Sequence, residues 1–269
     1  MNTLKKISFV LIIHCLCYTS TLAQVADLPS MNQVTLNSIG DQIMSKGNIL
    51  GLSVAIAKKD SIVYSKGFGY IDAEKTMRVT NATRFDIASI SKLIGVIVIM
   101  KLVEQGKLNL GQTLDELLPS FPEKKQASRI TLEHLLSHRS GLQDYTLEFD
   151  SDFITKGEKP GMLEYLEFFR GKELVSEPGS SYKYNNSGFL LMAYIAEHNT
   201  GKTWQALINE LINEPTGLDF KLIKHVADSP NFSPIFDYGN HKIQIPIKSF
   251  KKGQFDQIRL WDYVIGDGG

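Results

Sequence analysis

Two different hydrophobic periods divide the chain. Between residues 31 and 44, apolar side chains recur every three or four positions, which is typical of an amphipathic helix. The next two apolar stretches, residues 52–57 and 62–70, are short and rich in β-formers, and a polar turn joins them. Runs of this kind around a turn predict a β-hairpin. The beginning of the chain is therefore expected to combine one helix with a two-stranded antiparallel sheet.

From residue 89 to residue 213 the apolar spacing is mostly helical, and glycine and proline divide it into segments. The longest segment begins at Ser89 and is expected to stop near Gly106, because glycine favours the position after a helix end. Residues 220–258 show no clear period. The sequence thus predicts an α+β protein, a mixture of α and β in which helices flank a small antiparallel sheet. Further helices are expected at residues 114–118, 131–138, 162–169, 187–198 and 204–213.

The beginning of the chain also has the pattern of a secretory signal peptide. Two lysines at positions 5 and 6 precede an apolar run over residues 9–16, and small residues ending at Ala23 form a suitable cleavage site. The apolar run is too short to cross a bilayer as a stable helix. We expect residues 1–23 to be removed. The mature protein would then be secreted or periplasmic and would keep no integral membrane span.

Composition narrows the chemistry of the mature chain. The two cysteines, Cys15 and Cys17, lie inside the expected signal, so its removal excludes disulfides, thiolate catalysis and cysteine-ligated metals. The formal net charge of zero gives no reason to expect nucleic acid or an anionic membrane as a partner. Length fits one large domain or two small ones. We expect one domain over residues 24–269, with a sheet-and-helix part at 24–99 and a mainly helical part at 100–250.

A serine and a lysine three residues apart, Ser89 and Lys92, stand at the predicted start of the longest helix. On a helix this spacing puts both side chains on one face, with their Cβ atoms about 5–6 Å apart. A serine hydroxyl is a weak nucleophile until a neighbouring base takes its proton. A lysine can be that base when burial or a second cation lowers its pKa. The pattern predicts Ser89 as the nucleophile of a hydrolase, activated by Lys92; the alternative for Ser89 is a plain helix N-cap.

The Ser-x-x-Lys pattern is not specific by itself, because it also occurs at Ser180/Lys183 and Ser249/Lys252. Ser180 lies in a Pro-Gly turn and Ser249 in a basic loop. Ser89, in contrast, opens a long apolar segment that can support a reactive pair. This context favours Ser89 over the other two serines.

A second candidate constellation, Tyr184 and Asn186, lies between a Pro-Gly turn and the helix predicted from residue 187. A tyrosine can transfer protons when nearby cations lower its pKa from about 10. An asparagine side chain can donate to a substrate carbonyl and accept from a lysine. The alternatives are a packed aromatic ring for Tyr184 and a helix N-cap for Asn186. The same Tyr-x-Asn pattern recurs at Tyr238/Asn240.

Taken in order, these motifs resemble the serine β-lactamase and penicillin-binding-protein superfamily. The resemblance is strongest to the branch that holds class C β-lactamases, D-Ala-D-Ala carboxypeptidases and esterases. Residues 89–92 match Ser-x-x-Lys, residues 184–186 match Tyr-x-Asn, and residues 130–142 resemble a characteristic family segment between them. Ordered agreement over most of the chain is more specific than any single motif. The resemblance implies a β-lactamase/transpeptidase-like fold.

The resemblance also implies an acyl-enzyme mechanism and a role for each motif residue. Ser89 would attack an amide, ester or β-lactam carbonyl, and its backbone N–H would be one oxyanion donor. Lys92 and Tyr184 would share the proton transfers, and Asn186 would bind and orient the substrate. No cofactor and no metal are implied. The expected partner is a small-molecule or peptidoglycan-like substrate.

One part of the family pattern has no counterpart in the sequence. The third motif, Lys-Thr-Gly or His-x-Gly on a late strand, does not occur in the expected order. Residues 251–253 carry the letters Lys-x-Gly, but they precede the glycine-rich residues 266–269, which resemble a loop upstream of that strand. We therefore expect a C-terminally truncated chain with the last sheet strands missing. A non-catalytic pseudoenzyme or cell-wall-binding fragment is the alternative function.

Other chemistries have less support in the sequence. His134 and His138 are four apart on one predicted helix, a spacing that can bind zinc, but the glutamate that follows the first histidine in a zinc protease is absent. A zinc hydrolase is thus a third possibility, and helix packing is the ordinary explanation of the two histidines. No Gly-x-Ser-x-Gly elbow and no glycine-rich phosphate loop occur.

Overall fold

The expected signal peptide, the Ser249/Lys252 and Tyr238/Asn240 copies of the two motifs and the glycine-rich residues 266–269 lie outside the described part of the structure. The described chain forms two compact units, one ending at Thr83 and one beginning at Arg84. All four candidate site residues therefore belong to the second unit. The structure is a computed structural model that describes residues 32–47, 49–72, 74–85, 87–147, 162–222 and 232–233.

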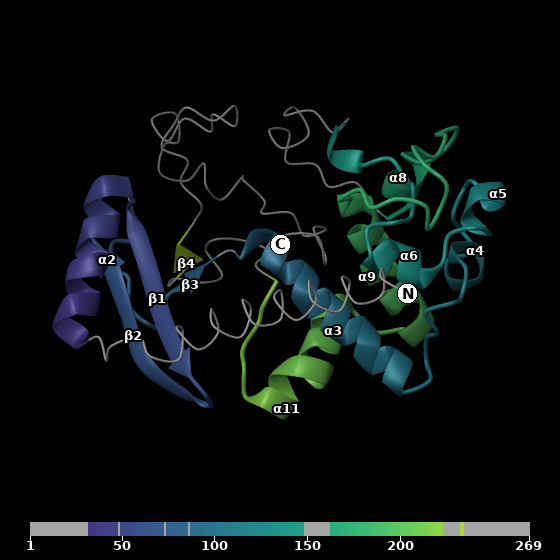
Figure 1. Ribbon diagram of the computed structural model, residues 1–269. Coiled ribbons are helices and arrows are strands. Elements are labelled where there is room, and N and C mark those ends of the chain that lie inside the picture. Colours follow the sequence, from purple (N-terminus) through teal and green to yellow (C-terminus); the bar gives the residue numbers. More distant parts are fainter. Residues whose placement is uncertain are drawn as a thin grey trace, which may run out of the picture. The chain divides into compact units, whose positions relative to one another are not determined.

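The first unit is a hairpin with one helix beside it (Figure 1). Helix α2 spans Gln33–Gly47, strand β1 spans Gly51–Lys58 and strand β2 spans Ser61–Gly69. The two strands are antiparallel and contain one irregularity in their register. Gly40 of α2 lies against the ring of Phe68, where a Cβ would come within 2.2 Å of Phe68 Cζ. Glycine therefore lets the helix approach β2 closely, and the predicted helix and hairpin are both confirmed.

The second unit is mainly helical. It begins with strand β3 (Arg84–Phe85), which pairs in parallel with strand β4 (Phe232–Ser233). A 3₁₀ turn, η1 (Ala88–Ile90), then leads into helix α3 (Ser91–Glu104). The other helical elements are α4 (Leu114–Leu117), α5 (Lys124–Ala127), α6 (Leu132–Leu136), η2 (Tyr145–Leu147), α8 (Met162–Glu167), α9 (Asn186–Thr200), α10 (Trp204–Ile208), η3 (Asn209–Asn213) and α11 (Glu214–Thr216).

The helix predicted over residues 204–213 is longer and less regular than expected. Its middle part, η3, is a π-helix, and α11 continues beyond it. Pro215 lies at the first turn of α11, a position that tolerates a missing N–H. Gly217, with φ of 69°, ends the helix in the left-handed conformation that glycine adopts without cost.

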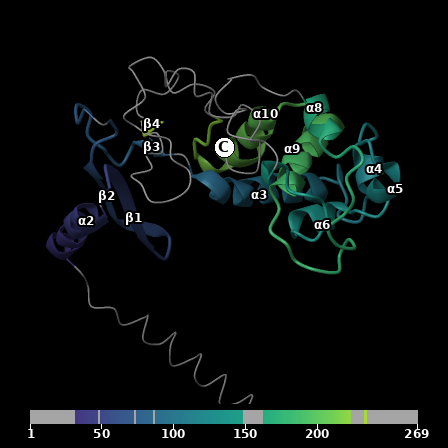
Figure 2. The same ribbon diagram turned by 90° about the horizontal axis from the view of Figure 1, so that it is seen from above.

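Helix α9 forms the centre of the core of the second unit. Every residue from Ser187 to Ala196 is buried. Helices α4, α6 and α10 contact it, and both views of the fold show α4 and α6 close by (Figures 1 and 2). Gly95 of α3 faces Met192, because a Cβ on Gly95 would lie 2.6 Å from Met192 Cε. A glycine at this position thus brings α3 and α9 close together.

The outer side of α3 is exposed and apolar. Leu93, Ile97 and Met100 recur at helical spacing, and Ile90 of the preceding turn extends the row. Their exposed fractions are 61, 40, 42 and 63%, respectively. We call these four residues the outer stripe of α3. No helix in the described part of the chain is long and apolar enough to cross a membrane.

Candidate active site

Ser89 lies in η1, not in the helix that follows. The preceding residue, Ala88, has φ of 44°, which a right-handed helix does not allow. The α-helix therefore begins at Ser91, and the prediction that it begins at Ser89 is wrong by two residues. Ser89 itself is exposed.

Lys92 projects from the first turn of α3 toward Ser89. Its Nζ donates a hydrogen bond of 3.1 Å to Ser89 Oγ, so the expected pairing of hydroxyl and amine is confirmed. The lysine is only 5% exposed. Its Nζ also lies 5.2 Å from the ring centroid of Tyr184 and 5.7 Å from that of Phe189. Aromatic faces attract a cation at this range.

Tyr184 reaches the same oxygen from a distant part of the sequence. Its phenolic O–H donates to Ser89 Oγ at 2.8 Å across 95 positions of chain. The tyrosine immediately precedes Asn185, the N-cap of α9. The Asn185 side chain is buried, accepts from the N–H of Gly188 at 2.9 Å and donates to the carbonyl of Leu142 at 2.8 Å. The start of the core helix thus fixes the backbone that carries Tyr184.

Asn186 does not cap the helix, as its alternative explanation required, because that position belongs to Asn185. Its backbone N–H donates to the Asp144 carboxylate at 2.9 Å, and its side-chain nitrogen donates to the two oxygens of the same carboxylate at 3.1 and 3.4 Å. No residue in the described range donates to the amide oxygen of Asn186. Asp144 therefore orients the amide group and leaves its oxygen as the end that can accept from a ligand.

His138 is a neighbour of this site that the sequence assigned only to packing or zinc. Its ring stacks on Tyr184 at a centroid distance of 4.4 Å and an interplanar angle of 30°. Its Nδ1 accepts from the N–H of Asn185 at 3.1 Å. The pKa of His138 is lowered, mainly by burial and also by the charge of Lys92, while the hydrogen bond with the Asn185 backbone and the charge of Asp144 act in the opposite direction. The family-like segment at residues 130–142 was the one signal that could have pointed to this residue.

The two histidines do not share a helix face. Helix α6 ends at Leu136, and His138 follows in the left-handed conformation with φ of 57°. His134 Nδ1 accepts instead from the N–H of Thr131 within the first turn of α6. The helical spacing expected for a zinc pair is therefore absent. Across the residues that the structure describes, no group of three or more metal-binding side chains occurs.

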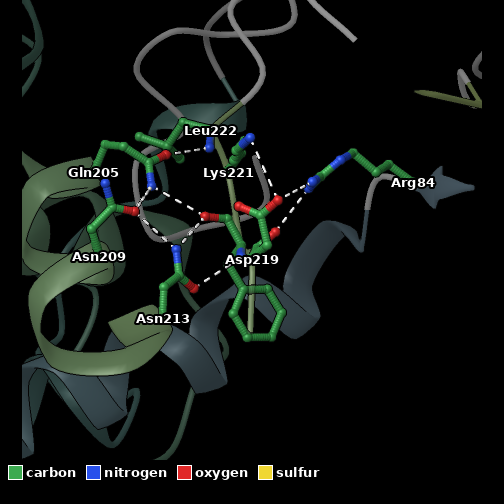
Figure 3. Close-up of polar contacts among 8 residues, drawn as sticks. Arg84, Gln205, Asn209, Asn213, Asp219, Lys221 and Leu222 are labelled. Atoms are coloured by element: carbon green, nitrogen blue, oxygen red, sulfur yellow. Dashed lines mark hydrogen bonds and ion pairs between the residues drawn. The ribbon is translucent and has the colours of Figure 1, made fainter. Parts of the chain in front are cut away.

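A polar network holds the strand that precedes Ser89 (Figure 3). Arg84 of β3 donates to the backbone carbonyl of Asp219 at 2.8 Å and forms an ion pair with its carboxylate. Asn213 holds the next residue on both sides: its amide nitrogen donates to the Phe220 carbonyl, and its oxygen accepts from the Phe220 N–H, each at 2.9 Å. Gln205 accepts from the N–H of Leu222 at 2.6 Å. Side chains of α10 and η3 thus hold residues 219–222 in place, and Asp219 of this segment binds Arg84.

The competing Ser-x-x-Lys pair has a different environment. Ser180 Oγ donates to the carbonyl of Glu177 at 2.6 Å inside a turn. Lys183 is exposed, and its backbone N–H donates to the His138 carbonyl. No hydrogen bond joins the Ser180 and Lys183 side chains in the described structure. The structure thus separates this pair from the one at Ser89, while the third pair lies outside the described residues.

Comparison with known families agrees with the geometry. The Beta-lactamase family model matches residues 36–247, so this chain belongs to that family. The fold is accordingly β-lactamase/transpeptidase-like, with α and β elements and a small antiparallel sheet, as the sequence predicted.

Several individual proteins are similar to this chain in sequence or structure. It is 26% identical to Protein flp of Staphylococcus aureus over 87% of this chain and 46% of that protein. An octameric penicillin-binding protein homologue from Pyrococcus abyssi is 29% identical with a TM-score of 0.63, over 76% of this chain and 47% of the other. EstCE1, a hydrolase with promiscuous acyltransferase activity, is 27% identical with a TM-score of 0.62, over 73% and 54%. The chain spans about half the length of the curated relatives it matches.

Proposed function

We propose that this protein is a secreted serine hydrolase that acts through an acyl-enzyme on an amide, ester or β-lactam. The observation that carries the proposal is the convergence on one oxygen: Ser89 Oγ accepts hydrogen bonds from both Lys92 and Tyr184. A hydroxyl held by two proton-transfer groups is what an activated serine requires. Family membership and the likeness to a penicillin-binding protein homologue and to an acyl-transferring hydrolase support the same reaction class.

The reaction would have two steps. In the first, the proton of the Ser89 hydroxyl passes to one member of the Lys92–Tyr184 pair in its basic form, the neutral amine or the phenolate, as Oγ bonds to the carbonyl carbon. The C–N or C–O bond of the substrate then breaks, and the pair returns the proton to the leaving nitrogen or oxygen. In the second step, water attacks the ester on Ser89 and gives a proton to the same pair. The acid leaves, and the proton restores the hydroxyl of Ser89.

Two further groups would bind the substrate. The backbone N–H of Ser89 is a donor for the oxyanion, because it lies beside the N-terminus of α3, where the helix dipole favours negative charge. The amide oxygen of Asn186, oriented by Asp144, would accept a hydrogen bond from the substrate backbone. Substrates of this kind include small molecules and the D-amino peptides of peptidoglycan. An expected signal peptide over residues 1–23 would bring the enzyme to them.

Covalent labelling tests the proposal directly. The wild-type protein is incubated with a fluorescent penicillin and, separately, with a fluorophosphonate, and compared with Ser89→Ala. Labelling by at least one probe should disappear in Ser89→Ala and persist in Ser180→Ala, the matched control from the second Ser-x-x-Lys pair. Undiminished labelling of Ser89→Ala would reject the nucleophile. Labelling without turnover of esters or β-lactams would favour the alternative, a non-catalytic pseudoenzyme or cell-wall-binding fragment.

A further inference from the structure

We propose that His138, as a neutral imidazole, is the positioning residue that holds Tyr184 on the nucleophile. This inference rests on the proposed function, because it assigns a cause to the placement of one of the proton-transfer groups. His138 touches Tyr184 and the backbone around it, and it makes no contact with the reacting oxygen in the described structure. It would act on the reaction only through the tyrosine.

The residues on either side of Tyr184 are both hydrogen-bonded to His138. The N–H of Lys183 donates to the His138 carbonyl at 2.8 Å, and the N–H of Asn185 donates to His138 Nδ1 at 3.1 Å. The imidazole ring then stacks on the ring of Tyr184 itself. One residue therefore holds the backbone before the tyrosine, the backbone after it and the aromatic face between them.

The position of the imidazole is itself well determined. His138 has φ of 57°, so its backbone follows a left-handed turn directly after the C-cap of α6. Its ring is packed against Phe189 at 4.7 Å and meets Tyr182 edge-on at 5.6 Å. With aromatic rings on several sides, the imidazole cannot leave Tyr184 without breaking other contacts.

This arrangement requires the neutral ring. Nδ1 accepts the N–H of Asn185, so the proton of the neutral imidazole sits on Nε2. A protonated ring would carry an N–H on both nitrogens and would oppose the N–H of Asn185. The charged groups that face the ring are Lys92 of α3, which disfavours a second cation, and Asp144, which favours it. Among the described residues, the phenols of Tyr182 and Tyr184 also lie against the ring.

The consequence is a pH dependence of known sign. Burial and the charge of Lys92 outweigh the hydrogen bond with Asn185 and the charge of Asp144, so the pKa of His138 lies below its ordinary value near 6.5. At pH values above the pKa of His138, this histidine should not change the position of Tyr184 or the labelling rate at Ser89. Below it, protonation should release the segment around Tyr184 and lower the rate.

The experiment compares three substitutions over the pH range that spans this titration. His138→Ala removes the ring and the acceptor. His138→Asn keeps an acceptor and suits the left-handed backbone, but it neither stacks nor titrates near neutral pH. His134→Asn is the matched control, because His134 also accepts a backbone N–H through Nδ1 but has no ring contact with Tyr184 in the described structure. The readouts are the labelling rate at Ser89 and the melting temperature.

We expect His138→Ala to label about a hundredfold more slowly, since small misplacements of catalytic groups can have effects of this size. His138→Asn should label at an intermediate rate and lose the acidic fall that the wild-type rate shows. His134→Asn should keep the wild-type rate and pH profile. If His138→Ala does not fold, the labelling rate and pH profile of His138→Asn decide whether the inference holds. A wild-type profile in His138→Asn would overturn the inference.

A second measurement separates this inference from the proposed function. If the wild-type protein is not labelled at any pH, the proposed function fails, and histidine NMR then tests His138 alone. The Nε2–H tautomer should be seen for His138, and the ring signals of Tyr184 should shift as His138 takes its proton but not as His134 does. If the Tyr184 ring signals do not shift as His138 titrates, the positioning role is overturned, whether or not the protein is active.

Discussion

Helices α3 and α9 both support the candidate site at their N-terminal ends, yet they are held in different ways. Helix α9 is buried all around from Ser187 to Ala196, and Tyr184 lies just before it. Helix α3 is buried along one face only, and its outer stripe is exposed. The comparison teaches that Tyr184 is fixed by a helix embedded in the core, whereas Ser89 and Lys92 depend on one face of their helix and on the strand that precedes it.

The largest expected effect follows from the buried helix. Leu191 of α9 is fully buried. Its truncation to alanine should lower the free energy of unfolding by about 2–5 kcal/mol, because it removes buried methyl groups and leaves a cavity. Urea denaturation measures this change. A loss below about 1 kcal/mol would mean that α9 is not the centre of the core.

The cap of α9 should have the next largest effect. Asn185→Ala removes the bond to the Gly188 N–H and leaves the Leu142 carbonyl without its side-chain donor. We expect a loss of about 1–3 kcal/mol in stability, together with slower labelling at Ser89. Thr203→Ala is the control, because Thr203 caps α10 in the same way but is remote in sequence from Tyr184. That variant should lose stability and keep its labelling rate; equal labelling losses in both variants would contradict a special role for the cap of α9.

Strand β3, which precedes Ser89, allows a test of how Ser89 and Lys92 are held in place. Arg84→Gln breaks the ion pair with Asp219. The side chains of Arg84 and Asp219 are 32 and 55% exposed, respectively. Such exposed pairs contribute about 0–1 kcal/mol, so stability should hardly change. The labelling rate should fall nonetheless, because β3 leads directly into the turn that carries Ser89. Lys101→Gln breaks another exposed pair, with Glu104 at the far end of α3, and should leave the rate unchanged; a similar fall in both variants would argue against the anchor.

The smallest effect is expected on the outer stripe. Leu93→Ala is the same chemical change as Leu191→Ala, but Leu93 is 61% exposed. Its free energy of unfolding should change by about 0.5 kcal/mol or less. Urea denaturation of both alanine variants, side by side, measures the asymmetry of the two helices. A loss at Leu93 that approached the loss at Leu191 would show that the stripe is covered in solution.

The sequence predicted the elements whose signals are local. The hairpin, the helix at the beginning of the first unit and the stop of α3 near Gly106 follow from hydrophobic period and glycine placement, and the structure contains all three. The closeness of Ser89 and Lys92 follows from their spacing. The contact of Tyr184 with Ser89 spans 95 positions, so it was expected only from the order of family motifs.

The rest depended on backbone conformations that side-chain patterns do not report. Ala88 and His138 both have positive φ, which is unusual for residues other than glycine, and their sequences give no warning of it. As a result Ser89 was placed inside a helix, and His138 was placed on a helix face with His134. Neighbouring asparagines posed a similar problem, because either Asn185 or Asn186 could cap α9, and tertiary contacts decide between them.

The turn at Ala88 has a consequence for engineering the protein. A left-handed conformation costs an alanine about 1–2 kcal/mol, whereas glycine adopts it without this cost. A search for heat-resistant variants would therefore select Ala88→Gly early. The same substitution would let the loop sample many more conformations, and Ser89 would spend less time hydrogen-bonded to Lys92 and Tyr184. At this one position, a gain in thermal stability should therefore come with a slower labelling rate at Ser89.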